Sequence, residues 1–159
     1  MKIQVRTAKE SDAIAACNVI RSSILRCCAE DHRNDAKLLE GWLHNKTPEF
    51  VLRCILDPTA YSVVASMDEE IVGFGSALDT GEVTLCYVAP SMIFKGVGKA
   101  LLTALEEHAA LAGVDALHLD STRTARAFYL RNGFMAEVPP VQAFGMEGQP
   151  MRKELLGRG

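Results

Sequence analysis

The stretch FKGVGKALL, residues 94–102, decides the fold of this chain. Its two glycines, Gly96 and Gly98, are flanked by lysines and lead directly into an apolar pattern with helical spacing. A strand-like run at residues 82–88 precedes them. The first N–H groups of a helix have no internal partners, and glycine lets this backbone approach a ligand closely. The stretch therefore predicts a strand, a glycine turn and a helix that together hold a phosphate-bearing ligand.

Two well-known glycine fingerprints do not fit this turn. A P-loop has a serine or threonine after its Gly-Lys pair, whereas Ala100 follows Lys99 here, and Ile93 takes the place of its first glycine. In the dinucleotide fingerprint GxGxxG, Leu101 takes the place of the third glycine. Glycine turns also open many helices for steric reasons alone, so the function of this turn depends on the motifs that come later in the chain.

The composition indicates one ordinary globular domain, residues 1–159, with 48% hydrophobic and 23% charged residues. A net charge of −3 offers no concentrated basic face for nucleic acid. No apolar run is long enough to span a bilayer, and residues 1–6 alternate like a strand instead of forming a signal-peptide core. We therefore expect a cytoplasmic protein that binds neither nucleic acid nor membrane.

The five cysteines are odd in number and form no Cys-x-x-Cys pair, so we expect neither a disulfide framework nor a metal site. Cys17 and Cys86 lie in apolar patterns and are expected in the core. Of the adjacent Cys27 and Cys28, one should face inward from a helix and the other can line a pocket. The role of this pair stays open.

Hydrophobic periodicity predicts strands and helices in alternation along the chain. Strands are predicted at residues 3–6, 61–67, 70–78, 82–88, 116–119, 134–138 and 151–155. Helices are predicted from a Ser11-Asp12 cap to about residue 29, around residues 38–42, from a Thr47 cap to residue 56, from residue 96 to residue 112, and at residues 122–132. Loops are predicted at residues 30–35 and 141–149. This order implies an α/β fold with a mixed sheet and helices on both faces.

A second motif, AxxFYxxxGF at residues 125–134, comes after the glycine turn and an intervening strand. In this order, the run of residues 87–102 and the second motif resemble the GCN5-related N-acetyltransferase (GNAT) superfamily. The similarity is strongest between residues 63 and 134. It implies an α/β fold whose mixed, mostly antiparallel central sheet is flanked by helices on both faces. It also implies acetyl-CoA as co-substrate and no metal.

The resemblance implies a cofactor site along the strand, the glycine turn and the second motif. Backbone N–H groups of the turn would bind the pyrophosphate, and the two lysines would add charge at its edge unless they are only surface lysines. The strand would pair with the pantetheine amides and polarise the thioester carbonyl through a backbone N–H. The expected cofactor-binding residues are Cys86, Tyr87, Val88, Lys95, Gly96, Val97, Gly98, Lys99, Ala100, Thr122 and Tyr129.

Tyr129 and Glu82 are the catalytic residues that the resemblance implies. In the family, a tyrosine at the position of Tyr129 donates a proton to the departing thiolate; simple packing of its ring under the sheet is the alternative. Glu82 matches the general base of some histone-acetylating members; the alternatives are an exposed strand-end carboxylate, Asp120 as base, or a water chain. We expect direct transfer of an acetyl group to a primary amine in a ternary complex, because no cysteine has a recognisable base partner.

Two positions depart from the family pattern. Ile93 replaces the usual glutamine or arginine before the glycine turn, and Thr122 replaces a frequent asparagine, although its hydroxyl can still cap a helix. Both changes would weaken cofactor binding. Ile93 and the unidentified general base keep a non-catalytic acyl-CoA-binding module as the alternative function, but such a module would not need Tyr129.

The acceptor is a small-molecule or peptide amine that the sequence does not identify. The resemblance places residues 26–42 over the acceptor site, where their acidic groups would suit a cationic amine unless this segment is only a solvated loop. Dimers are common in the family, and the sequence neither predicts nor excludes one.

Overall fold

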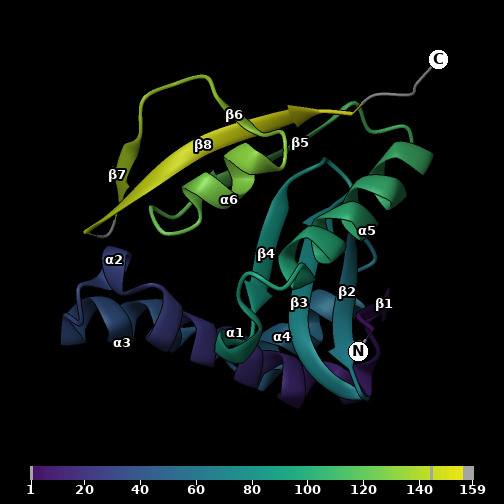
Figure 1. Cartoon of the computed structure of the whole chain (residues 1–159), viewed down its shortest axis with the longest axis horizontal. Coiled ribbons are helices and arrows are strands. Elements are labelled where there is room, and N and C mark those ends of the chain that lie inside the picture. The colour runs from purple at the N-terminus through teal and green to yellow at the C-terminus, as the bar shows by residue number, and fades with distance from the viewer. Residues whose placement is uncertain (1, 144, 156–159) are drawn as a thin grey trace.

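The central sheet is split into two parts in the computed structural model, which describes residues 2–143 and 145–155 (Figure 1). The first part is antiparallel, with the order β1-β2-β3-β4; the second has the order β5-β8-β6, and β7 pairs with β8. The strands of the first part are β1 (Gln4–Thr7), β2 (Ala60–Met67), β3 (Glu70–Leu78) and β4 (Val83–Val88). Those of the second are β5 (Ala116–Ser121), β6 (Met135–Ala136), β7 (Val141–Ala143) and β8 (Met146–Glu154).

Helices cover both faces of the first sheet (Figure 1). α1 (Ala13–Cys27) and α4 (Pro48–Leu56) pack on one face, and α5 (Val97–Leu111) packs on the other. The remaining helices are α2 (Ala29–His32), α3 (Ala36–His44) and α6 (Arg126–Arg131), with short 3₁₀ turns at Glu10–Asp12 and Pro90–Met92. The prediction of an α/β fold with a mostly antiparallel sheet between helices is confirmed.

Each face of the first sheet has its own core, because alternate strand residues point to opposite faces. Val63 and Ala65 of β2 pack with Leu101 and Leu105 of α5. Val64 of β2 and Phe74 of β3 pack with the apolar residues of α1 and with Val51 of α4. The helical spacing read from the sequence therefore identifies most of the buried faces of α1 and α5, but Ile14, Leu25 and Leu111, which belong to the same apolar patterns, are exposed.

Several predicted element boundaries are wrong. The segment 30–35 is not a solvated loop, because it contains most of α2 and its Asp31 and His32 are buried. The segment 141–149 is not a loop, because β7 and the first part of β8 lie there and pair with each other. The predicted helix at 122–132 begins only at Arg126, and the predicted strand at 134–138 is reduced to Met135–Ala136.

The predicted cap of α1 also differs. The Asp12 side chain does not cap the helix. Its carboxylate instead accepts hydrogen bonds from the Arg6 guanidinium at 2.8 and 3.0 Å and from the Lys9 backbone N–H at 2.7 Å. By contrast, the predicted Thr47 cap is confirmed, since its hydroxyl accepts from the Phe50 N–H at 3.1 Å.

β4 and β5 run in parallel but are joined only by one bridge, which lies just before β4 begins. Glu82 and His118 form a single parallel bridge, and the His118 N–H donates to the Gly81 carbonyl at 3.0 Å. On the other side of β4, Ser76 faces Leu85 and Ala77 faces Val83, so Thr84 is an extra, bulged residue. Among the described residues no further β4–β5 pair is formed, and the edge of β4 beyond the bulge is open toward β5.

Candidate functional site

The gap between β4 and β5 is a cleft of about 640 Å³. One wall is the whole of β4, and the opposite wall is the end of β5 with the following turn and α6. The glycine turn before α5 lies at one edge, and Cys27 and Cys28 from the end of α1 lie at another. Segments that are far apart between residues 23 and 131 therefore meet in one cavity, which is where ligands are usually bound.

The open edge of β4 presents its backbone to the cleft. Cys86 and Val88 pack toward the α5 side of the sheet, whereas Tyr87 packs toward α1. β3 satisfies one edge of β4, but the edge that faces the cleft has no strand partner among the described residues after the Glu82 bridge. An extended ligand with amide groups can add to such an edge as a further strand would.

The glycine turn opens α5 in the way the sequence predicts. Gly96 is the N-cap residue and has φ of +89°, a left-handed conformation that glycine adopts without strain. The first N–H groups of α5 have no helical acceptor and point outward at the positive end of the helix dipole. Gly98 and Lys99 line the cleft at this end. The turn thus fits an anionic group such as a diphosphate.

Gly98 is also required by packing within the protein. A Cβ atom at this position would lie 2.9 Å from the Phe128 ring and 3.6 Å from the Val88 side chain. The first distance is too short for two carbon atoms, so any side chain here would displace the Phe128 ring. Because Phe128 precedes Tyr129 on α6, a substitution of Gly98 would disturb the turn and the tyrosine together.

Tyr129 lies on the wall opposite β4 and is buried among aromatic rings. Its ring meets the rings of Phe128 and Phe134 edge-on, with centroids 5.2 and 5.4 Å away. Its hydroxyl is within hydrogen-bonding reach of the Cys86 thiol across the cleft. Burial, and then the neighbouring Cys86 and Tyr87, raise the pKa of Tyr129 well above 10. The hydroxyl therefore stays protonated at neutral pH and can act as a proton donor.

The thiols of the cleft are also held in their neutral form. Burial raises the pKa of Cys86 to about 12, although the Tyr129 hydroxyl opposes this. Burial, and then the nearby Asp31, raise the pKa of Cys28 to about 12. A thiol is a weak nucleophile when it is not ionised. The expected core location of Cys17 is confirmed, and both Cys27 and Cys28 line the cleft.

Tyr87 is fixed beneath the N-terminal helices. Burial raises the pKa of Tyr87 well above its usual value, and the neighbouring Trp42 side chain opposes this rise. The Trp42 ring meets the imidazole of His32 edge-on at 6.3 Å. These contacts join α3, α2 and β4 at the end of the cleft that the N-terminal helices cover.

His32 holds the end of α1 in place. Its Nδ1 accepts from the Asn34 N–H at 2.9 Å, so its Nε2 is the atom that donates to the Ile24 carbonyl, at 3.0 Å. The side chain is completely buried, and both ring nitrogens are used. His32 is therefore a structural residue and does not face the cleft.

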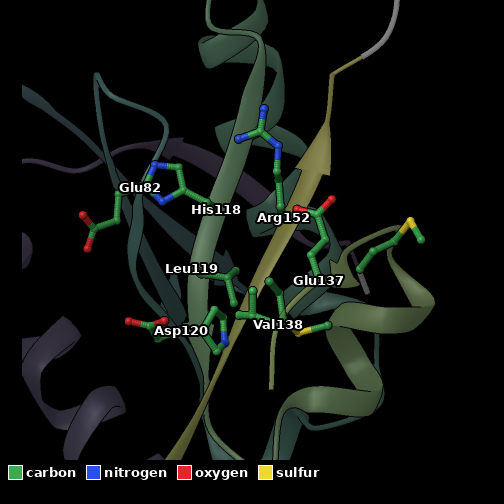
Figure 2. A pocket seen from close by; sticks show the side chains of 10 residues that line it. Glu82, His118, Leu119, Asp120, Glu137, Val138 and Arg152 are labelled. Atoms are coloured by element: carbon green, nitrogen blue, oxygen red, sulfur yellow. The ribbon is translucent and has the colours of Figure 1, made fainter. Parts of the chain in front are cut away.

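Glu82 lies in a smaller hollow of about 310 Å³ beside the cleft (Figure 2). His118 and Asp120 of β5 line this hollow, with Glu137 and Arg152. In Figure 2 the carboxylates of Glu82 and Asp120 lie on one side of β5, and that of Glu137 lies on the other. Leu119 and Asp120 line both the hollow and the cleft, so the two spaces adjoin along β5.

The structure brings most of the predicted cofactor residues together. Those that line the cleft are Cys86, Tyr87, Val88, Gly96, Gly98, Lys99, Thr122 and Tyr129. Lys95, Val97 and Ala100 are not among the lining residues; Val97 is buried and Lys95 is exposed. The Thr122 hydroxyl accepts from the Ala125 N–H at 3.2 Å and so caps the turn before α6. Glu82 is not brought next to Tyr129.

Sequence reasoning missed several residues of the cleft walls. Ser23, Thr124, Ala125 and Arg131 line the cleft and were not predicted there. Ser23 lies one turn before Cys27 on the same helix, which is a spacing that could have indicated it. No local pattern indicates Arg131 or Thr124, because their position depends on how α6 packs.

In the described part of the chain, no group of three or more histidine, cysteine, aspartate or glutamate side chains is arranged to hold a metal ion. None of the helices in residues 2–143 and 145–155 is both long and apolar enough to cross a membrane.

A sequence model for the acetyltransferase (GNAT) domain matches residues 28–155 of the chain. This range includes the glycine turn, the AxxFYxxxGF motif and all the cleft-lining residues except Ser23 and Cys27. No curated protein sequence matches the chain.

Solved structures of acetyltransferases share the fold over nearly the full length. A GCN5-related N-acetyltransferase from Rhodopseudomonas palustris has a TM-score of 0.85 at 23% identity, over 98% of this chain and 97% of that one. The PaiA N-acetyltransferase from Thermoplasma acidophilum, solved with coenzyme A, has a TM-score of 0.83 at 22% identity, over 97% and 99%. An aminoglycoside 6′-N-acetyltransferase with coenzyme A has a TM-score of 0.76 at 16% identity, over 100% and 99%.

Proposed function

The chain belongs to the acetyltransferase (GNAT) domain family, and we propose that it transfers the acetyl group of acetyl-CoA directly to a primary amine in the β4–β5 cleft. The observation that carries this proposal is the juxtaposition of three features in one cavity. These are the open edge of β4, the glycine turn before α5, and the protonated Tyr129 on the opposite wall. Each matches a different part of a CoA thioester.

The diphosphate and the pantetheine arm of the cofactor are proposed to bind through the backbone. The diphosphate would accept hydrogen bonds from the N–H groups that come after Gly96, with Lys99 adding charge at the edge of the cleft. The pantetheine amides would pair with the open edge of β4. A β4 N–H near Cys86 would then polarise the thioester carbonyl and stabilise the oxyanion that forms there.

Tyr129 is proposed to act as the general acid. The amine nitrogen attacks the thioester carbon, and the C–S bond then breaks to give a thiolate. A proton from the Tyr129 hydroxyl converts this thiolate to the thiol of free CoA, and the tyrosinate that remains takes a proton from water to complete the cycle. The hydroxyl already faces a sulfur atom, that of Cys86, and its raised pKa keeps the proton available at neutral pH.

Glu82 is proposed to receive the proton that the amine loses. Its carboxylate lies in the adjoining hollow and not in the cleft, so we propose transfer through water along β5 and past Asp120. Asp120 lines both spaces and is the alternative acceptor of this proton. The variants Glu82→Gln and Asp120→Asn distinguish these two candidates. If a carboxylate base must be ionised, kcat/KM of the wild type falls toward acid pH, and the variant in which this fall disappears identifies the base.

Direct transfer in a ternary complex is supported by the state of the cleft thiols. A covalent route would need a thiolate, but burial raises the pKa of Cys86 and of Cys28 to about 12. Neither of these two thiols is therefore ionised and ready to attack the acyl group. Intact-mass measurement of the protein after incubation with acetyl-CoA alone should show no added acetyl group.

Calorimetric titration with acetyl-CoA, without acceptor, is the first test. Binding should be followed by release of CoA, measured by chromatography, when a panel of primary amines is added. Chromatography avoids thiol reagents, which the five cysteines would consume. Absence of acetyl-CoA binding by the folded protein would refute the proposal, and binding without turnover on any amine would indicate a non-catalytic module.

A further inference from the structure

Asp31 connects one edge of the cleft, at the end of α1, to the wall formed by β5, the following turn and α6, across 92 residues of sequence. One carboxylate oxygen accepts the Arg123 N–H at 2.7 Å. The other accepts the Thr124 N–H at 3.2 Å and also the Thr124 hydroxyl. The Asp31 residue is only 5% exposed, so these three bonds replace the water that its charge would otherwise bind.

The segments on both sides of this link line the cleft. Cys28 lies one helical turn before Asp31, and Thr124 is one of its hydrogen-bond partners. Asp31 therefore fastens the segment after α1 to the turn between β5 and α6. The separation of these two segments sets the width of the cleft at this end.

The turn that Asp31 holds leads directly into Tyr129. Thr122 accepts from the Ala125 N–H at 3.2 Å, and the Ala125 carbonyl accepts from the Tyr129 N–H at 3.1 Å. α6 has only six residues, which is too short for a helix to be stable through its own hydrogen bonds. Its placement must therefore come from its packing and from the turn in front of it.

We propose that Asp31 is a positioning residue for acetyl transfer, because it holds the 122–125 turn and thereby places Thr122 and Tyr129 against β4. This inference rests on the proposed function, in which Tyr129 is the general acid. Asp31 does not act on the substrate itself. Three of the roughly four acceptor positions of its carboxylate are already used within the protein, so it is not a free anion for a cationic amine.

The test compares Asp31→Asn with Asp68→Asn. Both substitutions make the same chemical change, but Asp68 is exposed in the turn between β2 and β3 and lines neither the cleft nor the hollow. Asparagine at position 31 has the same shape as aspartate, yet its NH₂ group must face an N–H or hydroxyl donor of the turn. We expect Asp31→Asn to lower kcat for a fixed amine by about tenfold to a hundredfold, as small displacements of a reacting group do. Asp68→Asn should leave kcat unchanged.

A purely structural role would produce a different pattern. Asp31→Asn would then lower the melting temperature, but kcat measured well below that temperature would equal the wild-type value, and this result would overturn the proposal. Thr124→Val removes only the hydroxyl bond and serves as a milder second variant. Its effect on kcat should be smaller than that of Asp31→Asn and should not add to it in the double variant.

Amide NMR spectra keep this inference separate from the proposed function. If wild-type protein neither binds nor turns over acetyl-CoA, the proposed function fails, but the effect of Asp31 on the 122–125 turn and α6 can still be measured. Asp31→Asn should then shift the amide resonances from Thr122 through Tyr129. Shifts confined to residues next to position 31 and to residues 123–124 would show that Asp31 does not position α6.

Discussion

Removal of the Tyr129 hydroxyl tests the proposed chemistry most directly. Phenylalanine keeps the ring and therefore its edge-on contacts with Phe128 and Phe134, at 5.2 and 5.4 Å. The lost hydroxyl faces only a thiol, which is a weak hydrogen-bond partner. The free energy of unfolding should therefore change by no more than about 1 kcal/mol. Calorimetric titration should give nearly the wild-type affinity for acetyl-CoA.

The expected effect of Tyr129→Phe is on turnover. General acid catalysis contributes about 10²–10⁴-fold when it is needed in full. A thiolate, however, is a better leaving group than an alkoxide, because the pKa of a thiol is about 8.5, far below that of an alcohol. We therefore expect kcat to fall by about tenfold to a thousandfold, which corresponds to about 1.4–4 kcal/mol in the barrier.

The assay is the chromatographic measurement of CoA release at saturating amine, from about pH 6 to about pH 10. Because burial raises the pKa of Tyr129, its acid form persists across this range, and wild-type kcat should show no alkaline decline from this group. Tyr61→Phe is the matched control, since Tyr61 stacks on His108 at 3.8 Å and does not line the cleft. Loss of acetyl-CoA affinity equal to the loss of rate would assign Tyr129 to packing and refute the reasoning.

Two further predictions concern cofactor binding and stability. Ile93→Arg restores a side chain of the type that is usual before the glycine turn. We expect it to tighten acetyl-CoA binding by about threefold at low salt and by less at high salt. Ile93→Leu is the control, and an unchanged or weaker affinity of Ile93→Arg for acetyl-CoA would show that this position does not reach the cofactor. Arg6 lowers the pKa of Asp12 through its hydrogen bonds to the carboxylate. The ionised carboxylate therefore stabilises the fold at every pH above the unfolded-state pKa of about 4. This contribution to stability disappears as the pH falls through the lower pKa that Asp12 has in the folded state. Asp12→Asn should therefore lower the free energy of unfolding by about 1 kcal/mol at neutral pH and flatten its decline toward acid pH, as measured by urea denaturation. Asp79 is exposed, so Asp79→Asn should change neither the free energy of unfolding at neutral pH nor its decline toward acid pH. If Asp12→Asn lost stability toward acid pH as steeply as the wild type, Asp12 would not be the source of this decline.

Elements with strong local patterns were predictable from the sequence. The glycine turn and α5 follow from Gly96 and from an apolar pattern within one helix. The Thr47 cap of α4 is set by atoms three residues apart. The AxxFYxxxGF motif indicated the family because its residues all lie within one short helix and the turn after it. In each case the interactions that decide the structure join neighbouring residues.

Other elements depend on partners far away in the chain. Residues 30–35 are polar and were expected to be a loop, but Asp31 is buried because its acceptors are used by donors 92 and 93 residues later. The glycine and proline of β8 favour a loop locally, yet β8 pairs with β5, β6 and β7. Long-range pairing therefore overrode the local preference in both segments.

The sequence by itself determined the family and the glycine turn, and it indicated Tyr129 as a candidate site residue, since all three depend on residues close together in the chain. Only the tertiary structure decided which residues share the cleft. It placed Glu82 in the adjoining hollow, showed that Gly98 is packed against Phe128, and joined α2 to the turn before α6. The physical reason is that β4 and β5 separate after a single bridge, and the geometry of that separation is set by packing between segments that no local pattern relates.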